Sequence, residues 1–260
     1  MIGPEFASCW LKLGRAEEHL NTIKSELLVW MDSKPYSISR KCDPQGSRYS
    51  QILEIAKPAP YDRWSLIAGD CIHNLRSSLD SLVYAVAIRE SGSSPPPGYD
   101  KLQFPITSSA ENFAKQTYRL SSISNGARAR IERAQPYNRP HQQLPPLLSL
   151  LSELDNLDKH RLLNVVMANV GEGKFSFALP GGKLIPMKIG YHTGAVKSGT
   201  EVAYFIMDPP EQNVNYQHEA TVVISMEHPA GPSGRTFGEI AYILAVLIAE
   251  VRRIVEQMIL

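Results

Sequence analysis

The sequence has few cysteines and almost no net charge. Only 3 of its 260 residues are cysteine, and the wide spacing of Cys9, Cys42 and Cys71 predicts neither a disulfide scaffold nor a CxxC metal or redox motif. The 27 basic and 26 acidic residues give a net charge of +1, which offers no general argument for binding nucleic acid or anionic membranes. With 43% hydrophobic residues, the composition is typical of a folded globular protein and excludes a disordered one.

Long hydrophobic runs are also missing. A membrane span needs about 18 or more apolar residues, and the longest candidate, residues 240–260, is interrupted by Glu250, Arg252, Arg253, Glu256 and Gln257. No basic segment followed by an apolar core predicts a secretory signal. We therefore expect a cytoplasmic protein with reduced cysteines and no membrane interaction. Met1–Phe6 is interpreted as a cloning remnant.

Apolar residues at helical spacing predict several helices. The segments are residues 6–31, about 61–90, one or two short helices within 110–133, about 145–169, and 240–258. The stripe of the last segment is too apolar to remain without a partner. We expect it to pack back against the earlier helices.

The remaining segments predict β-structure. A hairpin is expected near residues 35–57, around the turn Asp43-Pro44-Gln45-Gly46. Runs at 174–179 and 184–189 flank Gly181-Gly182, which suits a hairpin turn, and two further strands are expected at 201–207 and 220–226.

Together these elements predict an α+β fold, a helical bundle with an inserted antiparallel β subdomain. The expected domains are a bundle over residues 7–170 that includes the hairpin, a β subdomain over 171–232, and a C-terminal helix over 233–260 that returns to the bundle.

The segment from Gly69 to Asp80 carries the first candidate site residues. Asp70 and His73 are three residues apart, His73 and Arg76 are three apart, and Arg76 and Asp80 are four apart, so each pair can meet on one helix surface. A carboxylate next to a histidine can orient its ring and raise its pKa, which suits general acid or base catalysis. A solvated polar face with ion pairs within the helix is the alternative.

A second segment adds Asp158 and Arg161. Both fall on the helix face of Leu147, Leu151 and Leu154, so we expect them to point inward, where an unpaired charge is costly. The polar face of the 61–90 helix could supply their partners, either as a buried ion-pair network that fixes helix register or as a functional pocket. His160 is expected to point away from this face.

These segments also carry a resemblance. Gly69-Asp70, His73-Asn74-Leu75-Arg76 and Leu79-Asp80, with Gln135-Pro136-Tyr137 and Asp158-Lys159-His160-Arg161, resemble a family of uncharacterised bacterial proteins. The helical part of that family is similar to HEPN-type bundles, many of which are RNases or partners of nucleotidyltransferases in toxin–antitoxin and defence systems. HEPN RNases carry an Arg followed a few residues later by a His on one helix. Here His73 precedes Arg76, and Arg15 and His19 have only three intervening residues and lie off the buried stripe. The Arg and the His would therefore have to come from different helices.

Other kinds of site have weaker support in the sequence. Asp70, His73 and Asp158 could form part of a metal site, but a second matching carboxylate-x-x-His is missing, so no metal is predicted. Sequences of the GxSxG, Walker and GxGxxG types are absent, and no cofactor is expected. The Gly-rich residues 228–235 precede the C-terminal helix and could bind an anion at its N-terminus. A connection from the β subdomain back to the bundle explains this segment better. No other candidate site residue lies at a suitable sequence spacing from His192 or His218, so neither is predicted to belong to a site.

Two functional hypotheses follow. In the first, the protein is a metal-independent RNase or related phosphodiesterase with His73 as acid or base, Asp70 or Asp80 orienting it, and Arg76 or Arg161 stabilising a phosphate. In the second, it is a binding or regulatory module in which the same residues, including Asp158, form a structural ion-pair network. RNA or a protein is the expected partner, and the resemblance implies a homodimer through helical faces.

Overall fold

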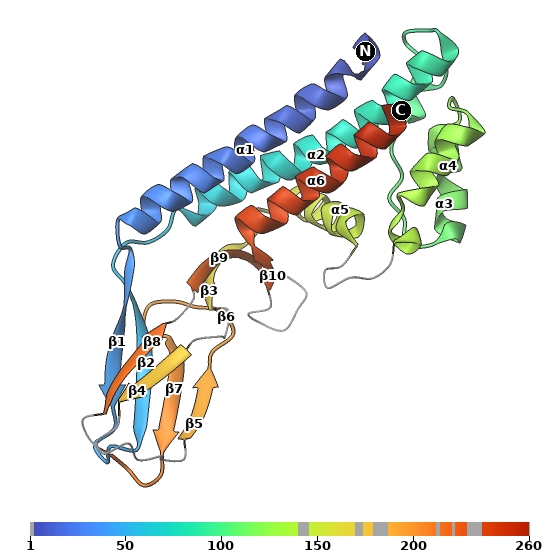
Figure 1. Ribbon diagram of the computed structural model, residues 1–260. Helices are drawn as coiled ribbons and strands as arrows, with labels where there is room; N and C mark the ends of the chain where they lie inside the picture. Colours follow the sequence, from blue (N-terminus) through green and yellow to red (C-terminus); the bar gives the residue numbers. More distant parts are fainter. Residues whose placement is uncertain are drawn as a thin grey trace. The chain divides into compact units, whose positions relative to one another are not determined.

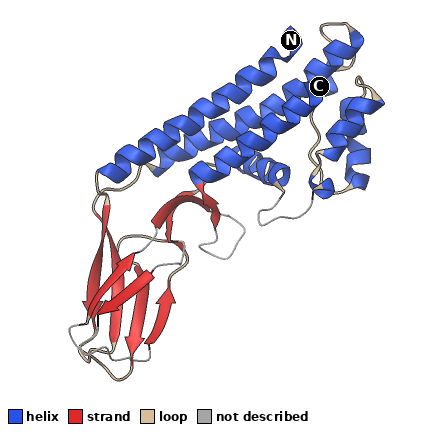
Figure 2. Cartoon of the chain, viewed as in Figure 1, coloured by secondary structure: helices blue, strands red, loops and turns tan. Residues whose placement is uncertain are grey.

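The fold is α+β and divides into two compact units. The computed structural model describes residues 3–139, 146–169, 174–178, 187–211, 214–219, 222–227 and 236–259. Within these ranges the chain forms helices and antiparallel sheets (Figure 2). The first unit comprises Met1–Lys24, Arg63–Leu163 and Ala241–Leu260, and the second comprises Ser25–Asp62 and Asn164–Ile240.

Five of the six α-helices in the described ranges agree closely with the helical periodicity. The helices, labelled in Figure 1, are α1 (Ala7–Asp32), α2 (Tyr61–Ser91), α3 (Ala110–Gln116), α4 (Asn125–Arg133), α5 (Leu147–Asp158) and α6 (Ile240–Ile259). The short helices α3 and α4 each begin at a serine cap. The Ser109 hydroxyl accepts from the Asn112 amide at the start of α3, and the Ser124 hydroxyl accepts from the Ala127 amide at the start of α4, each at 3.2 Å. The predicted interruption between α3 and α4 is therefore confirmed.

Helices α1 and α2 pack antiparallel in the first unit. The Ser78 hydroxyl donates to the Cys9 carbonyl at 2.9 Å, and the Cys71 thiol donates to the Ala16 carbonyl at 3.3 Å. Residue numbers thus rise along α1 as they fall along α2. Burial raises the pKa of both thiols to about 12, so Cys9 and Cys71 act as small apolar residues in this interface.

Helix α6 packs within the same unit, as its apolar stripe predicts. Its buried side chains include Ile243, Leu244, Leu247, Val251, Ile254, Val255 and Met258. Arg89 at the end of α2 donates to the carbonyls of Met258 and Ile259, both at 3.2 Å, which satisfies acceptors that the end of a helix leaves unpaired. Arg252 pairs with Glu17 of α1.

The described residues of the second unit form three antiparallel sheets. Their strands are β1 (Tyr36–Cys42), β2 (Arg48–Ile55), β3 (Val165–Asn169), β4 (Lys174–Ala178), β5 (Met187–Tyr191), β6 (Gly194–Ala195), β7 (Glu201–Met207), β8 (Asn215–Glu219), β9 (Val222–Glu227) and β10 (Thr236–Glu239). The strand orders are β1-β2-β7-β5, β10-β9-β3-β6 and β4-β8. An aromatic core forms where Tyr49 stacks on Phe205, with ring centroids 4.7 Å apart, and Phe175, Phe177 and Tyr216 contact Phe205 edge-on.

The strand pairing corrects two expectations. The hairpin β1–β2 is present, but it pairs with β7 and belongs to the second unit, whereas the predicted domain boundaries placed it with the bundle. Strand β4 pairs with β8 and β5 pairs with β7, so these two strands do not form the hairpin expected between them. Gly181 and Gly182, and residues 228–235, lie outside the described residues.

Helix α5 is shorter than the predicted helix over residues 145–169. It ends at Asp158, and Val165–Asn169 forms β3, which pairs with β9 from Val165↔Met226 to Asn169↔Val222. The ladder satisfies the backbone groups of a segment rich in β-branched residues, which favours a strand over a continued helix.

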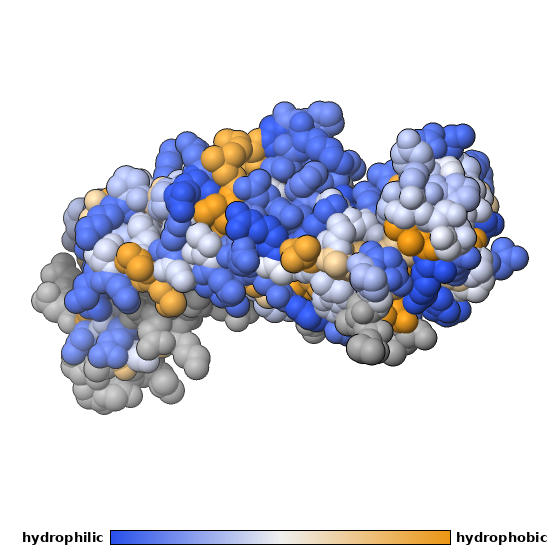
Figure 3. Space-filling view, turned by 90° about the horizontal axis from the view of Figure 1, so that it is seen from above, coloured by the Kyte–Doolittle hydropathy of each residue, from blue (hydrophilic) through white to orange (hydrophobic). Residues whose placement is uncertain are grey.

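The molecular face in Figure 3 is mostly hydrophilic, with hydrophobic residues in separate patches. Leu11, Leu28 and Val29 of α1 are among the exposed large hydrophobic side chains. Among the described residues, no helix combines the length and the apolar character that a membrane crossing requires.

Candidate functional site

Two of the predicted site residues form a closed structural network. The Arg76 guanidinium donates to Asp80 Oδ1 at 2.9 Å and to the Phe104 carbonyl at 2.6 Å. The Phe104 amide donates back to Asp80 Oδ1 at 2.9 Å. The pairing of Arg76 with Asp80 follows from their spacing on α2, but the backbone of Phe104 was not predicted as a partner.

This network holds the segment around Phe104 against α2. Arg76 is only 9% exposed and Phe104 is fully buried. Burial raises the pKa of Asp80, although the Arg76 charge and the Phe104 amide act in the opposite direction. Both side chains already have their partners, so the geometry gives Arg76 and Asp80 a structural role.

The adjoining segment is fixed by the Gln135-Pro136-Tyr137 motif. Gln135 is fully buried; its amide nitrogen donates to the Pro105 carbonyl at 2.9 Å, and its amide oxygen accepts from the Thr107 amide at 2.9 Å. The motif therefore positions residues 105–107 by satisfying backbone groups that are out of reach of water.

A second group of charged residues meets at Gly69. A Cβ atom at Gly69 would lie 2.7 Å from Cγ and 2.9 Å from Oδ2 of Asp158, which is closer than real Cβ contacts allow. Asp158, the last residue of α5, therefore places its carboxyl group directly against the backbone of α2. Glycine at this position allows α5 to bring a carboxylate to α2.

The electrostatics of Asp158 connect it to two predicted site residues on α2. Burial raises the pKa of Asp158, the charges of Asp70 and Asp155 raise it further, and the charge of His73 acts in the opposite direction. Asp70 and His73 are both exposed, one helical turn apart. The structure thus brings Asp70, His73 and Asp158 within electrostatic reach of one another on an accessible surface.

Arg161 was expected to point inward with Asp158, but it does not belong to this group. It lies beyond the end of α5 and is exposed, so it does not continue the buried stripe. The inward charge that the sequence analysis missed is that of Asp155. This residue is 4% exposed, and its Oδ2 forms an ion pair with Lys159 Nζ at 2.6 Å. Its position four residues after Leu151 could have identified it.

The α1 side of this surface carries two further residues, Lys12, which the sequence did not single out, and His19, which the sequence set aside because it lies off the buried stripe. Lys12 donates to the hydroxyls of Ser77 and Ser81 of α2, both at 2.7 Å. Farther along α1, burial and the charge of Arg15 lower the pKa of His19, while the charges of Asp70 and Glu18 act to raise it. His19 belongs to the α1 stripe only at its polar edge, so hydrophobic periodicity gave no signal for it.

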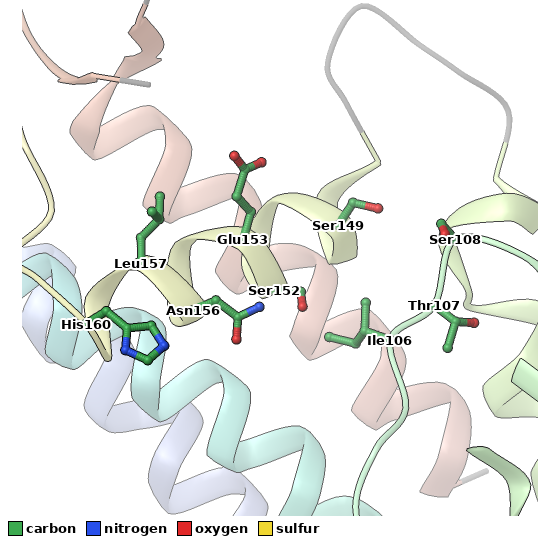
Figure 4. Close-up of a pocket in the computed structure, with 9 residues that line it drawn as sticks. All are labelled: Ile106, Thr107, Ser108, Ser149, Ser152, Glu153, Asn156, Leu157 and His160. Carbon is green, nitrogen blue, oxygen red and sulfur yellow. The ribbon is translucent and has the colours of Figure 1, made fainter. Parts of the chain in front are cut away.

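A pocket of about 550 Å³ lies on another face of α5 (Figure 4). Its lining residues are Ile106, Thr107, Ser108, Ser149, Ser152, Glu153, Asn156, Leu157 and His160. Figure 4 shows Ser152 and Asn156 extending from α5 toward Ile106, while Glu153 extends on the other side of the helix. His160 is exposed, as expected, but it lines this pocket.

The described ranges contain no group of three or more His, Cys, Asp or Glu side chains with the geometry to hold a metal ion. His192 contacts the Ala195 carbonyl through Nε2 at 3.0 Å, and the His218 side chain lies outside the described part of the structure. No protein-family model, curated protein or solved structure matches this chain.

Proposed function

We propose that the first unit is a HEPN-like RNA-processing module and that Asp70, His73 and Asp158 form its acid–base site. The observation that carries the proposal is the exposed His73 imidazole within electrostatic reach of Asp158, a carboxyl whose pKa is raised by burial against α2. Perturbed carboxyl groups beside an accessible histidine are typical of sites that transfer protons.

The chemistry suited to these groups is cleavage of an RNA phosphodiester without a metal. The 2′-oxygen attacks phosphorus, the bond between phosphorus and the 5′-oxygen breaks, and a 2′,3′-cyclic phosphate and a free 5′-hydroxyl result. One group must remove the 2′-hydroxyl proton and another must give a proton to the 5′-oxygen. In the proposal His73 performs one of these transfers, and Asp70 and Asp158 orient its ring.

Phosphate binding falls to a cation other than Arg76, whose guanidinium is bound to Asp80 and Phe104. Arg161 is exposed three residues after Asp158, and it can present its planar guanidinium to a phosphate oxygen. Because the net charge of the protein is near zero, its overall charge does not attract RNA, and binding of the phosphate depends on such local cations.

The test is degradation of mixed RNA in EDTA by the wild-type protein and by His73→Ala, purified identically. We expect cleavage by the wild type, 2′,3′-cyclic phosphate ends on its products, and a loss of at least about 100-fold in the variant. Circular dichroism checks that the variant is folded. Equal degradation by both proteins, or none by the wild type, contradicts the proposal.

The second candidate is a non-catalytic binding or regulatory module. It is favoured by the pocket on α5, whose hydroxyl and amide groups at Ser149, Ser152 and Asn156 suit hydrogen bonding to an uncharged polar ligand. In this alternative Asn156→Leu abolishes ligand binding, while His73→Ala has no effect on it. A thermal-shift screen of nucleosides with both variants separates the two candidates.

We also propose a homodimer that forms through helical faces. Leu11 on α1 is 74% exposed, which makes it a candidate contact. Sedimentation of the wild type and of Leu11→Glu tests this: a dimer that the substitution dissociates supports it, and a monomeric wild type contradicts it.

A further inference from the structure

The proposed cleavage needs two proton-transfer groups, and His73 supplies only one of them. The first unit presents a second imidazole, that of His19 on α1, which is partly buried. Neither the spacing within α2 nor the stripe of α5 points to it. Its relation to the site comes from the register of α1 against α2.

The register is fixed by hydrogen bonds along one edge of the helix pair. The Ser8 hydroxyl contacts the Ser81 hydroxyl at 3.4 Å, and Lys12 four residues later donates to the Ser77 hydroxyl at 2.7 Å. An advance of four residues along α1 is thus matched by a retreat of four residues along α2. Antiparallel packing of two helices with the same rise per residue produces this correspondence.

The same register brings His19 opposite Asp70. His19 lies seven residues beyond Lys12 on α1, and Asp70 lies seven residues before Ser77 on α2. Seven residues are close to two full turns, so both side chains return to the edge occupied by Lys12 and Ser77. The Cys71–Ala16 hydrogen bond, at 3.3 Å, fixes the helices in this register close to His19.

Charge supports the same arrangement. The groups that act on His19 are Arg15 and Glu18 of its own helix and Asp70 of α2. Arg15 and Glu18 pair with each other at 2.7 Å, which leaves Asp70 as the carboxylate from the facing helix. Burial and Arg15 lower the pKa of His19, which favours the neutral imidazole that a general base requires.

We propose that His19 is the general base of this site, that Asp70 lies between it and His73, and that His73 is the general acid. The inference rests on the proposed RNA cleavage. His19 takes the proton of the 2′-hydroxyl as the bond from the 2′-oxygen to phosphorus forms. His73, in its protonated form, gives its proton to the 5′-oxygen as the bond from phosphorus to that oxygen breaks. The substrate class is therefore RNA with a free 2′-hydroxyl, and DNA of the same sequence is not cleaved.

Two measurements test His19, one of which does not depend on activity. In NMR titrations of the histidine imidazoles, Asp70→Asn lowers the pKa of His19, whereas the matched control Asp100→Asn, at an exposed position of the same unit, leaves it unchanged. In RNA cleavage, His19→Ala and the better-packed His19→Gln lose at least about 100-fold in kcat/KM and lose the acidic limb of the pH–rate profile. DNA remains intact.

The outcomes separate the inference from the function on which it rests. If His73→Ala loses cleavage but both His19 variants retain the rate and the acidic limb, the base assignment is wrong and the proposed function stands. If Asp70→Asn leaves the pKa of His19 unchanged, the proposed contact with Asp70 is wrong. Absence of cleavage by the wild type overturns the proposed function and, with it, the catalytic role of His19.

Discussion

Replacing Arg76 with methionine tests whether the network at Phe104 is structural. Arg76→Met keeps much of the aliphatic volume but removes the donors to Asp80 and to the Phe104 carbonyl. Loss of a charged donor from a buried carbonyl costs about 1.5–3 kcal/mol. Breaking a buried ion pair costs about 3–5 kcal/mol, but the Asp80 side chain is 31% exposed and water recovers part of this. We expect the free energy of unfolding to fall by about 3 kcal/mol.

The matched control is Arg15→Met. Arg15 also pairs with a carboxylate on its own helix, but the two side chains are 60% and 65% exposed, so its loss costs about 0.5 kcal/mol or less. Urea unfolding followed by tryptophan fluorescence measures both variants. A Trp30→Phe background restricts the signal to Trp10 and Trp64, which lie in the first unit.

Hydrogen exchange gives a local readout of the same change. The Phe104 amide donates to Asp80, so Arg76→Met should speed its exchange far more than that of amides in α3. An unfolding cost no larger than that of Arg15→Met would refute the structural reasoning. Unchanged stability with lost RNA cleavage would instead restore the catalytic role predicted for Arg76 from the sequence.

Three further predictions concern single groups. Gly69→Ala forces the Asp158 carboxyl away from α2, and we expect it to lower the free energy of unfolding by about 1 kcal/mol despite the better helix propensity of alanine. Gly14→Ala is the control: its new methyl group meets open space, so it should raise the free energy of unfolding by about 1 kcal/mol. Urea unfolding compares the two variants. Folding raises the pKa of Asp158, so its protonated carboxyl stabilises the fold below its ordinary pKa, and this stability is lost as pH rises through the raised pKa. Asp158→Asn should therefore be more stable than the wild type at pH 7 and equally stable near pH 3. Thermal unfolding at the two pH values measures this. A thiol-reactive dye should label Cys42 in the native protein and the other two cysteines only after denaturation; rapid native labelling of all three would contradict their burial.

The sequence predicted the elements whose signals are local and long. Helices α1, α2 and α6 each carry an apolar stripe over several turns, and the hairpin β1–β2 carries a turn sequence between two alternating runs. The α5 boundary was wrong because Leu162-Leu163 continues the apolar composition beyond the helix, while pairing with a distant strand decides the structure from Val165 onward. Strand partners were not predictable, since pairing is a property of the assembled sheet.

The candidate site was predictable to the same extent. Spacing along α2 was enough to pair Arg76 with Asp80, because both residues lie on one helix. It could not identify the Phe104 backbone, which reaches α2 from a non-helical segment. The inward position expected of Arg161 failed with the helix boundary, and His19 becomes visible only once the register of α1 against α2 is known.

The order of strands in the sheet β1-β2-β7-β5 has a consequence for synthesis on the ribosome. Strand β2 is complete at Ile55, but its partner on the far side, β7, begins at Glu201. At an elongation rate of about 5–20 residues per second, the hairpin waits on the order of 10 seconds with one edge open. An open strand edge is a template for pairing with another chain. The basic residues Arg40 and Lys41 on β1 and Arg48 on β2 place charge on the nascent hairpin during that interval, and charged side chains are a common protection against such pairing.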